Sequence, residues 1–284
     1  MPILKRGIYF NEWKSFQCKW IRRLYPCAVV DERDIKEVTP DDVKKYKRVH
    51  LFAGIAGWEY ALELAGWPES ILVWSGSCPC QPFSNCGKRE ETDDERHLWP
   101  EMFRLIKECR PTTVFGEQVS GSAGFRWIDG VSSNLGNIGY AVGVADLSSA
   151  SVNSPHNRKR LFWVAYSEGS TRIRTVMREN KRTHNRIPDG LRAWDRFEEI
   201  KCPGDNQTRR IEPGTLPMVD GIPSEMGRGS LISRQRSGRI DGYGNAIVPQ
   251  LAAVFIRAFM DVIDLEPCTR WEKNYAEDSR ALQD

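Results

Sequence analysis

One stretch of the sequence is the basis for interpreting the fold: Ile71-Leu72-Val73-Trp74-Ser75-Gly76-Ser77-Cys78-Pro79-Cys80-Gln81-Pro82-Phe83-Ser84. Residues 71–74 are apolar and predict a short buried strand. The residues after them are then expected in a loop at the carboxyl end of that strand, where open α/β sheets bind their ligands. Pro79 and Pro82 restrict the backbone around Cys80, which makes Cys80 a candidate nucleophile.

The cysteines of this stretch have two other readings. Most cysteines in proteins are small buried hydrophobic residues. Cys78 and Cys80 could instead bind a metal, but structural zinc usually needs four ligands, and no second Cys/His pair completes a set with them. The sequence therefore predicts no metal site.

The composition is that of an ordinary globular protein. The 284 residues are 40% hydrophobic and 28% charged, and the net charge of +3 is too small to indicate a nucleic-acid partner by itself. The eight cysteines are irregularly placed, which indicates reduced thiols rather than a disulfide framework. The absence of an apolar run of about 18 residues and of an amino-terminal leader favours a cytoplasmic protein without a membrane partner.

Short apolar runs alternate with helical patterns along the chain. Strands are expected over residues 8–12, 28–30, 49–52, 71–74, 112–119, 140–147 and 160–166. Helical spacing of apolar residues is found over 13–24, before Gly66, over 98–109 and over 251–259. This pattern is typical of an α/β domain.

Glycine and acidic residues stand where the predicted strands end. The turn Phe52-Ala53-Gly54-Ile55-Ala56-Gly57 lets the backbone approach a nucleotide-like ligand, although many such turns need glycine only for positive φ. Glu117 is either a solvated charge or, beside Cys80, an acid that could exchange a proton with a bound substrate. The simplest interpretation of Glu12 is a solvated charge, and that of Trp13 is a core residue.

Residues 167–243 lose this periodicity and are rich in Gly, Pro and Arg. Between residues 171 and 186 there are six basic residues and one acid, and between 228 and 239 there are four arginines and no acid. Such a run is most often only a solvated surface. In a nucleic-acid enzyme it would suit contacts with phosphates and base edges.

Pro79-Cys80-Gln81-Pro82-Phe83-Ser84 resembles the catalytic-loop motif of the DNA cytosine-5 methyltransferases. Four further blocks resemble that family in type: the glycine turn at 52–57, Glu117-Gln118-Val119, the segment from Pro155 to Arg160, and Gly244-Asn245-Ala246-Ile247-Val248-Pro249. Ala56, Gln118 and His156 depart from the glycine, asparagine and glutamine that the family has at these places.

The resemblance implies a Rossmann-like, S-adenosylmethionine-dependent methyltransferase fold with a mostly parallel sheet in residues 1–166 and 244–284. It implies a small irregular target-recognition region in residues 167–243. The activity implied is methyl transfer from S-adenosyl-L-methionine to carbon 5 of a flipped-out cytosine in double-stranded DNA. The protein is expected to be a monomer in the cytoplasm of a bacterial or phage-infected cell, with a cognate restriction endonuclease as a further partner. An RNA cytosine methyltransferase and a catalytically silent DNA-binding or cofactor-binding relative remain alternatives.

The family's functional residues carry over onto the matching positions. Cys80 would add to carbon 6 of the base, Glu117 would act at N3, Arg160 would hold the base oxygen, and Arg158 would organise phosphate or the loop. The cofactor contacts implied are Phe52, Ala53, Gly54, Ile55, Gly57, Glu12, Trp13, Asp34, Ile35, Pro79 and Asn245. The DNA contacts expected are Gln81, Ser84, Arg172, Arg174, Arg234 and Arg236.

The order of the blocks departs from that of the family. The stretch between Gly57 and Cys80 holds one helix and one strand, which leaves no room for the two further strand-and-helix units that the family has there. Asn11-Glu12-Trp13 resembles the ribose/adenine block and Asp34-Ile35 the adenine block, yet both precede Phe52. We therefore predict a rearrangement in which the second and third strands of the sheet come first in the chain. Glu12 and Trp13 should then line the same pocket as Phe52.

Overall fold

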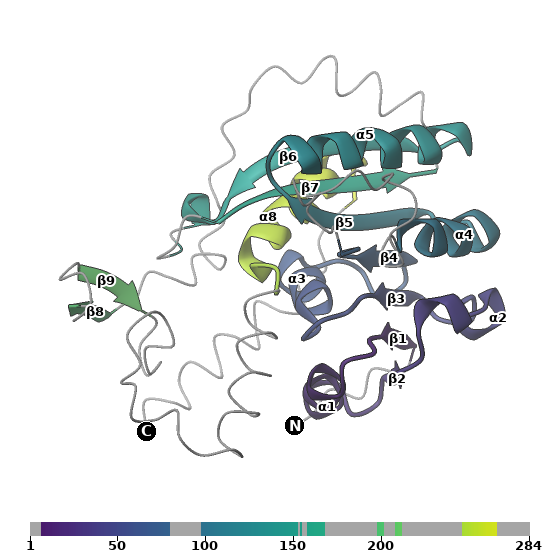
Figure 1. The fold of residues 1–284 in the computed structure, drawn as a ribbon, viewed down its shortest axis with the longest axis horizontal. Helices are drawn as coiled ribbons and strands as arrows, with labels where there is room; N and C mark the ends of the chain where they lie inside the picture. Colours follow the sequence, from purple (N-terminus) through teal and green to yellow (C-terminus); the bar gives the residue numbers. More distant parts are fainter. Residues whose placement is uncertain are drawn as a thin grey trace, which may run out of the picture.

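A seven-stranded sheet forms the centre of the part of the chain that the computed structural model describes, which is residues 7–79, 98–152, 154, 158–167, 198–201, 208–211 and 246–265. Its spatial order is β2-β1-β3-β4-β5-β7-β6 (Figure 1). The strands are β1 (Ile8–Asn11), β2 (Val29–Asp31), β3 (Arg48–Leu51), β4 (Val73–Gly76), β5 (Thr113–Val119), β6 (Ala141–Ser148) and β7 (Lys159–Tyr166).

The strands from β2 to β5 are all parallel, whereas β7 runs antiparallel to both of its neighbours, β5 and β6. The predicted α/β fold with a mostly parallel sheet is therefore confirmed. A separate antiparallel pair, β8 (Glu198–Lys201) and β9 (Thr208–Ile211), lies within the region expected to be irregular.

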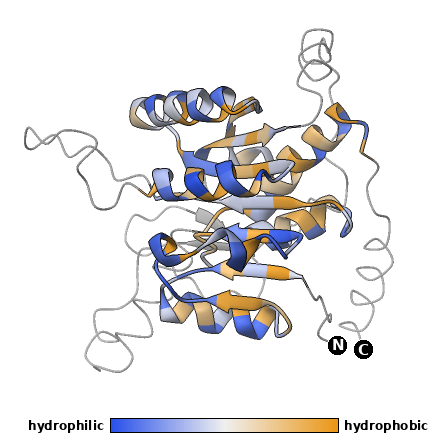
Figure 2. Cartoon of the chain, turned by 90° about the vertical axis from the view of Figure 1, so that its right-hand side faces the viewer, coloured by the Kyte–Doolittle hydropathy of each residue, from blue (hydrophilic) through white to orange (hydrophobic). Residues whose placement is uncertain are grey.

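Helices cover both faces of the sheet, because alternate strand residues point to opposite sides. Phe115 of β5 packs with α3 (Gly57–Ala65) and α8 (Pro249–Val262), while its neighbour Val114 packs with α4 (Trp99–Cys109) and α5 (Ser122–Asn137). The first face also carries α1 (Ser15–Leu24), whose Ile21 meets Phe10 of β1. The second face also carries η1 (Ile35–Glu37) and α2 (Pro40–Val43), and η2 (Ser149–Val152) follows β6. In Figure 2, hydrophobic residues lie on both strands and helices, and the helices also carry hydrophilic residues.

Two local expectations differ from the structure. The fourth strand is shifted by two residues, because Ser75 and Gly76 pair with His50 and Leu51 of β3 and so belong to the sheet rather than to the loop. No helix was expected between residues 120 and 139, where α5 runs. Its glycines, serines and asparagines have low helix propensity, but burial of Ile128 and Leu135 against the sheet stabilises it.

Among the described residues, none of the helices has both the length and the apolar character needed to cross a membrane.

Candidate active site

Parallel pairing brings the carboxyl ends of β1, β3, β4 and β5 to one edge of the sheet. The amino end of β7 lies at the same edge, because Arg160 pairs with Val119 at the end of β5. The residues predicted for the site that lie near these ends are therefore neighbours in space although they are far apart in sequence.

The glycine turn between β3 and α3 is held in a conformation that most residues avoid. Phe52, Gly54 and Ala56 all have positive φ, at 52°, 56° and 67°. Ala56 therefore adopts the left-handed conformation that glycine, the family's residue at this place, adopts without strain. A side chain at Gly54 would meet nothing within 4 Å, so there is open space beside this turn.

Glu12 joins the end of β1 to this turn. One carboxylate oxygen accepts the Gly54 N–H at 2.8 Å, and the other accepts the Lys14 N–H at 2.9 Å. Glu12 is only 7% exposed, so its interpretation as a solvated charge is wrong. Trp13 is 71% exposed, so its interpretation as a core residue is wrong as well.

The two residues predicted to contact adenine lie just after β2. The Asp34 carboxylate accepts the Lys36 N–H at 2.9 Å and so caps η1. Ile35 is buried in the core at 3% exposure. The Asn11 side chain donates to the Arg33 carbonyl at 2.9 Å, which ties this segment to the end of β1.

Glu117 lies near the end of β5, close to Arg160 at the start of β7 and to Arg158 just before that strand. Its carboxylate oxygen Oε1 is 2.7 Å from Nε of Arg160. Burial raises the pKa of Glu117, and the charges of Arg160 and Arg158 only partly oppose that effect. The backbone N–H of Arg158 donates to the Ser149 hydroxyl at 2.9 Å, which fixes the entry into β7. Such a carboxyl can hold a proton, and the neighbouring guanidinium groups can polarise a carbonyl oxygen.

Two side-chain hydrogen bonds hold the residues that follow β4. Trp58 of α3 donates its indole N–H to the Ser77 hydroxyl at 3.0 Å. Gln118 donates its amide N–H to the Cys78 carbonyl at 3.2 Å. Pro79 is exposed. The contact of Gln118 was missed from the sequence, where Gln118 stood out only as a departure from the family's asparagine.

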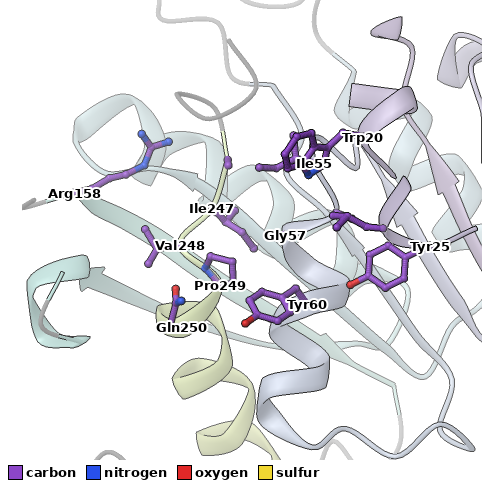
Figure 3. Close-up of a pocket in the computed structure, with 13 residues that line it drawn as sticks. Trp20, Tyr25, Ile55, Gly57, Tyr60, Arg158, Ile247, Val248, Pro249 and Gln250 are labelled. Atoms are coloured by element: carbon purple, nitrogen blue, oxygen red, sulfur yellow. The ribbon is translucent and has the colours of Figure 1, made fainter. Parts of the chain in front are cut away.

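A pocket of about 440 Å³ opens between the glycine turn, α1 and the start of α8 (Figure 3). It brings the predicted cofactor residues Ile55 and Gly57 together with Arg158. Sequence reasoning did not predict the other lining residues as cofactor contacts: Trp20, Leu24, Tyr25, Ala56, Tyr60, Ala246, Ile247, Val248, Pro249 and Gln250. Those in α1 and α3 showed only the spacing of helix packing, whereas Ala56 and residues 246–249 lie in blocks that resemble the family.

Several predicted site residues lie outside the described residues: Cys80, Gln81, Ser84, Arg172, Arg174, Arg234, Arg236 and Asn245. Within the ranges that are described, no three His, Cys, Asp or Glu residues are grouped so that they could hold a metal ion.

Residues 67–201 match the sequence model of a family described as C-5 cytosine-specific DNA methylase. The Type II methyltransferase M.AgeI of Thalassovita gelatinovora is 25% identical over 166 residues, which are 57% of this chain and 35% of the relative. The Type II methyltransferase M.HgiCII of Herpetosiphon aurantiacus is 25% identical over 206 residues, which are 52% of this chain and 46% of the relative. The chain thus spans less than half the length of either relative.

Among solved structures, the chain is similar to a crystal structure of a Spodoptera frugiperda DNMT2 mutant. The match covers 57% of this chain and 43% of the DNMT2 chain, with a TM-score of 0.41 and 16% sequence identity.

Proposed function

We propose that the chain transfers a methyl group to carbon 5 of cytosine in double-stranded DNA, because its residues 67–201 match the sequence model of the C-5 cytosine-specific DNA methylase family. The observation that carries this proposal is the buried Glu117, which lies 2.7 Å from Arg160 at the carboxyl edge of the sheet. Gln118, the next residue, contacts the start of the segment that bears Cys80. An acid with a raised pKa, two cations and a cysteine segment are the groups that this reaction needs.

The described residues fit S-adenosyl-L-methionine as the methyl donor. Open space lies beside Gly54, and the adjoining Glu12 carboxylate is suited to ribose hydroxyls. The exposed ring of Trp13 is available to stack on adenine. Asp34 and the backbone of Ile35 would contact adenine, and Phe52, Ala53, Ile55, Gly57, Pro79 and Asn245 would complete the site. When bound, the cofactor supplies the methyl group.

The side chains of this protein would activate the base. The Cys80 thiolate adds to carbon 6, while Glu117 donates a hydrogen bond or proton at N3 and Arg160 holds the base oxygen. Carbon 5 then becomes enamine-like and accepts the methyl group. Loss of the carbon 5 proton and expulsion of Cys80 restore the aromatic ring. Carbon 6 is inaccessible in stacked DNA, so the target base must be flipped out.

Residues 167–243 would select the target sequence. This region contains the β8–β9 pair, and its arginines would contact phosphates and base edges together with Gln81 and Ser84. We propose a monomer that acts in the cytoplasm of a bacterial or phage-infected cell, with a cognate restriction endonuclease as its functional partner.

Bisulfite sequencing of DNA from cells that express the protein tests the reaction. We expect unconverted cytosines in one short sequence context with the wild type and none with Cys80→Ala. Cys109→Ala, which alters a half-buried thiol on α4, is the matched control and should retain the wild-type pattern.

Full conversion of DNA from cells containing soluble wild-type protein would contradict the proposal. If cytosines of tRNA were methylated in those cells, the protein would be an RNA cytosine methyltransferase. DNA binding without any methyl transfer would assign a catalytically silent relative.

A further inference from the structure

The backbone pairing between β4 and β5 ends at Gly76, which lies opposite Gly116. Two residues further along each strand, the link between the two segments is a side chain. Gln118 Nε2 donates to the carbonyl oxygen of Cys78 at 3.2 Å. Both residues are buried, at 3% and 2% exposure. The amide of Gln118 therefore continues the connection where the backbone ladder stops.

The orientation of this amide is fixed at both ends. Its oxygen accepts the backbone N–H of Val119 at 2.8 Å, so its NH₂ group must face Cys78. A glutamate of the same size would keep the acceptor for Val119 but would put a second acceptor against the Cys78 carbonyl. A bond to a buried carbonyl would then be replaced by repulsion.

A second contact holds the same stretch from the first face of the sheet. The indole N–H of Trp58, which is 3% exposed, donates to the Ser77 hydroxyl at 3.0 Å. Ser77 is thus tied to α3 and Cys78 to β5. Two neighbouring residues held from two elements define where the chain leaves the sheet.

We propose that Gln118 is a positioning residue that fixes the start of the Cys80 segment relative to Glu117. The inference rests on the proposed function, because it gives Gln118 a part in aligning nucleophile and acid without contact to the base. Glu117 and Gln118 are adjacent on β5, so the same strand end carries the acid and the tether of the cysteine segment. Small misplacements of reacting groups lower rates steeply.

The test compares Gln118→Glu and Gln118→Asn with Gln17→Glu in the full chain. Gln118→Asn is uncharged and shortens the side chain by one methylene, so it remains informative where Gln118→Glu folds poorly. Gln17 is a glutamine of α1 with 4% exposure, so Gln17→Glu makes the same chemical change at a similarly buried position. Two assays are made: the kinetics of methyl transfer, which give kcat and KM, and the rate at which iodoacetamide alkylates Cys78 in a Cys80→Ala background.

We expect Gln118→Glu to lower kcat by about 10- to 100-fold, with the KM for S-adenosyl-L-methionine within about twofold of wild type. Alkylation of Cys78 should be about fivefold faster or more, because its surroundings open more often. Gln118→Asn should also lower kcat and raise the alkylation rate of Cys78. Gln17→Glu should leave both close to wild type.

An unchanged kcat in both Gln118 variants of an active enzyme would overturn the positioning role. An unchanged alkylation rate of Cys78 would overturn the tether whatever the activity. If the wild type transfers no methyl group, the proposed function fails, and the Cys78 rate still decides on the tether. If Gln17→Glu lowered kcat as much as the Gln118 variants do, the lower kcat would reflect general destabilisation of the fold, and the inference would also be overturned.

Discussion

Glu117 is a carboxyl group whose protonation decides what it can do. Burial raises its pKa, while the charges of Arg160 and Arg158 oppose the rise. A raised pKa keeps the proton on Glu117 to a higher pH than on an ordinary glutamate, which suits a donor at N3 of cytosine. As the pH rises through that pKa, the proton and the donor role are lost together.

We therefore expect Glu117→Gln to lower kcat by about 100-fold or more, because an amide can donate a hydrogen bond but cannot supply a proton. In the wild type, activity should fall as the pH rises, because Glu117 loses its proton. This fall should be absent from the variant. The measurement is the pH profile of methyl transfer for both proteins. Glu101→Gln, a change in a partly exposed acid of α4, should reproduce the wild-type profile. An alkaline loss that persists unchanged in Glu117→Gln would assign it to another group.

At the scale of elements, α3 is joined to β3 and β4 by a buried polar network. Glu59 in the first turn of α3 forms an ion pair with Arg48, and its other oxygen lies 3.0 Å from Nε2 of His50. His50 Nδ1 lies 2.7 Å from the Ser75 hydroxyl. His50 precedes the glycine turn and Glu59 follows it, so the network holds both ends of the turn.

Glu59→Gln should destabilise the fold by about 3 kcal/mol, because it leaves the buried Arg48 guanidinium without its countercharge. Urea unfolding of the two proteins measures the difference. Glu63→Gln changes a half-buried acid on the same helix and should have a much smaller effect. A loss below about 1 kcal/mol for Glu59→Gln would show that the surroundings compensate the missing charge.

At the scale of the whole molecule, the first two strands of the chain, β1 and β2, form one edge of the sheet beside β3. The contact between Glu12 and Gly54 joins residues 42 positions apart at one point. Glu12, Trp13 and Phe52 do not line the pocket of about 440 Å³ beside the glycine turn, so the prediction that the rearranged segments form one cofactor site rests on the contact between Glu12 and Gly54. That this site binds S-adenosyl-L-methionine stays a prediction.

Trp13→Ala tests that prediction. We expect the variant to bind S-adenosyl-L-methionine about fivefold or more weakly, since stacking of an aromatic side chain on a base contributes roughly 1–3 kcal/mol. Isothermal titration calorimetry gives the affinities. Phe125→Ala is the matched control, because Phe125 is an exposed aromatic residue of α5, on the other face of the sheet. Unchanged affinity in Trp13→Ala would contradict the rearranged cofactor site.

The strands, the glycine turn and the placement of Glu117 at a strand end follow from the sequence alone. Each rests on neighbours in the chain, because apolar runs and glycine turns are local signals. The tertiary structure decided the features that depend on distant segments. The buried Glu12 carboxylate accepts the N–H of the distant Gly54, and Gln118 becomes a tether because its amide donates to the carbonyl of Cys78. Helix α5 exists despite weak propensity because the sheet covers its apolar side, and no periodicity in one segment reveals which other segment it will meet.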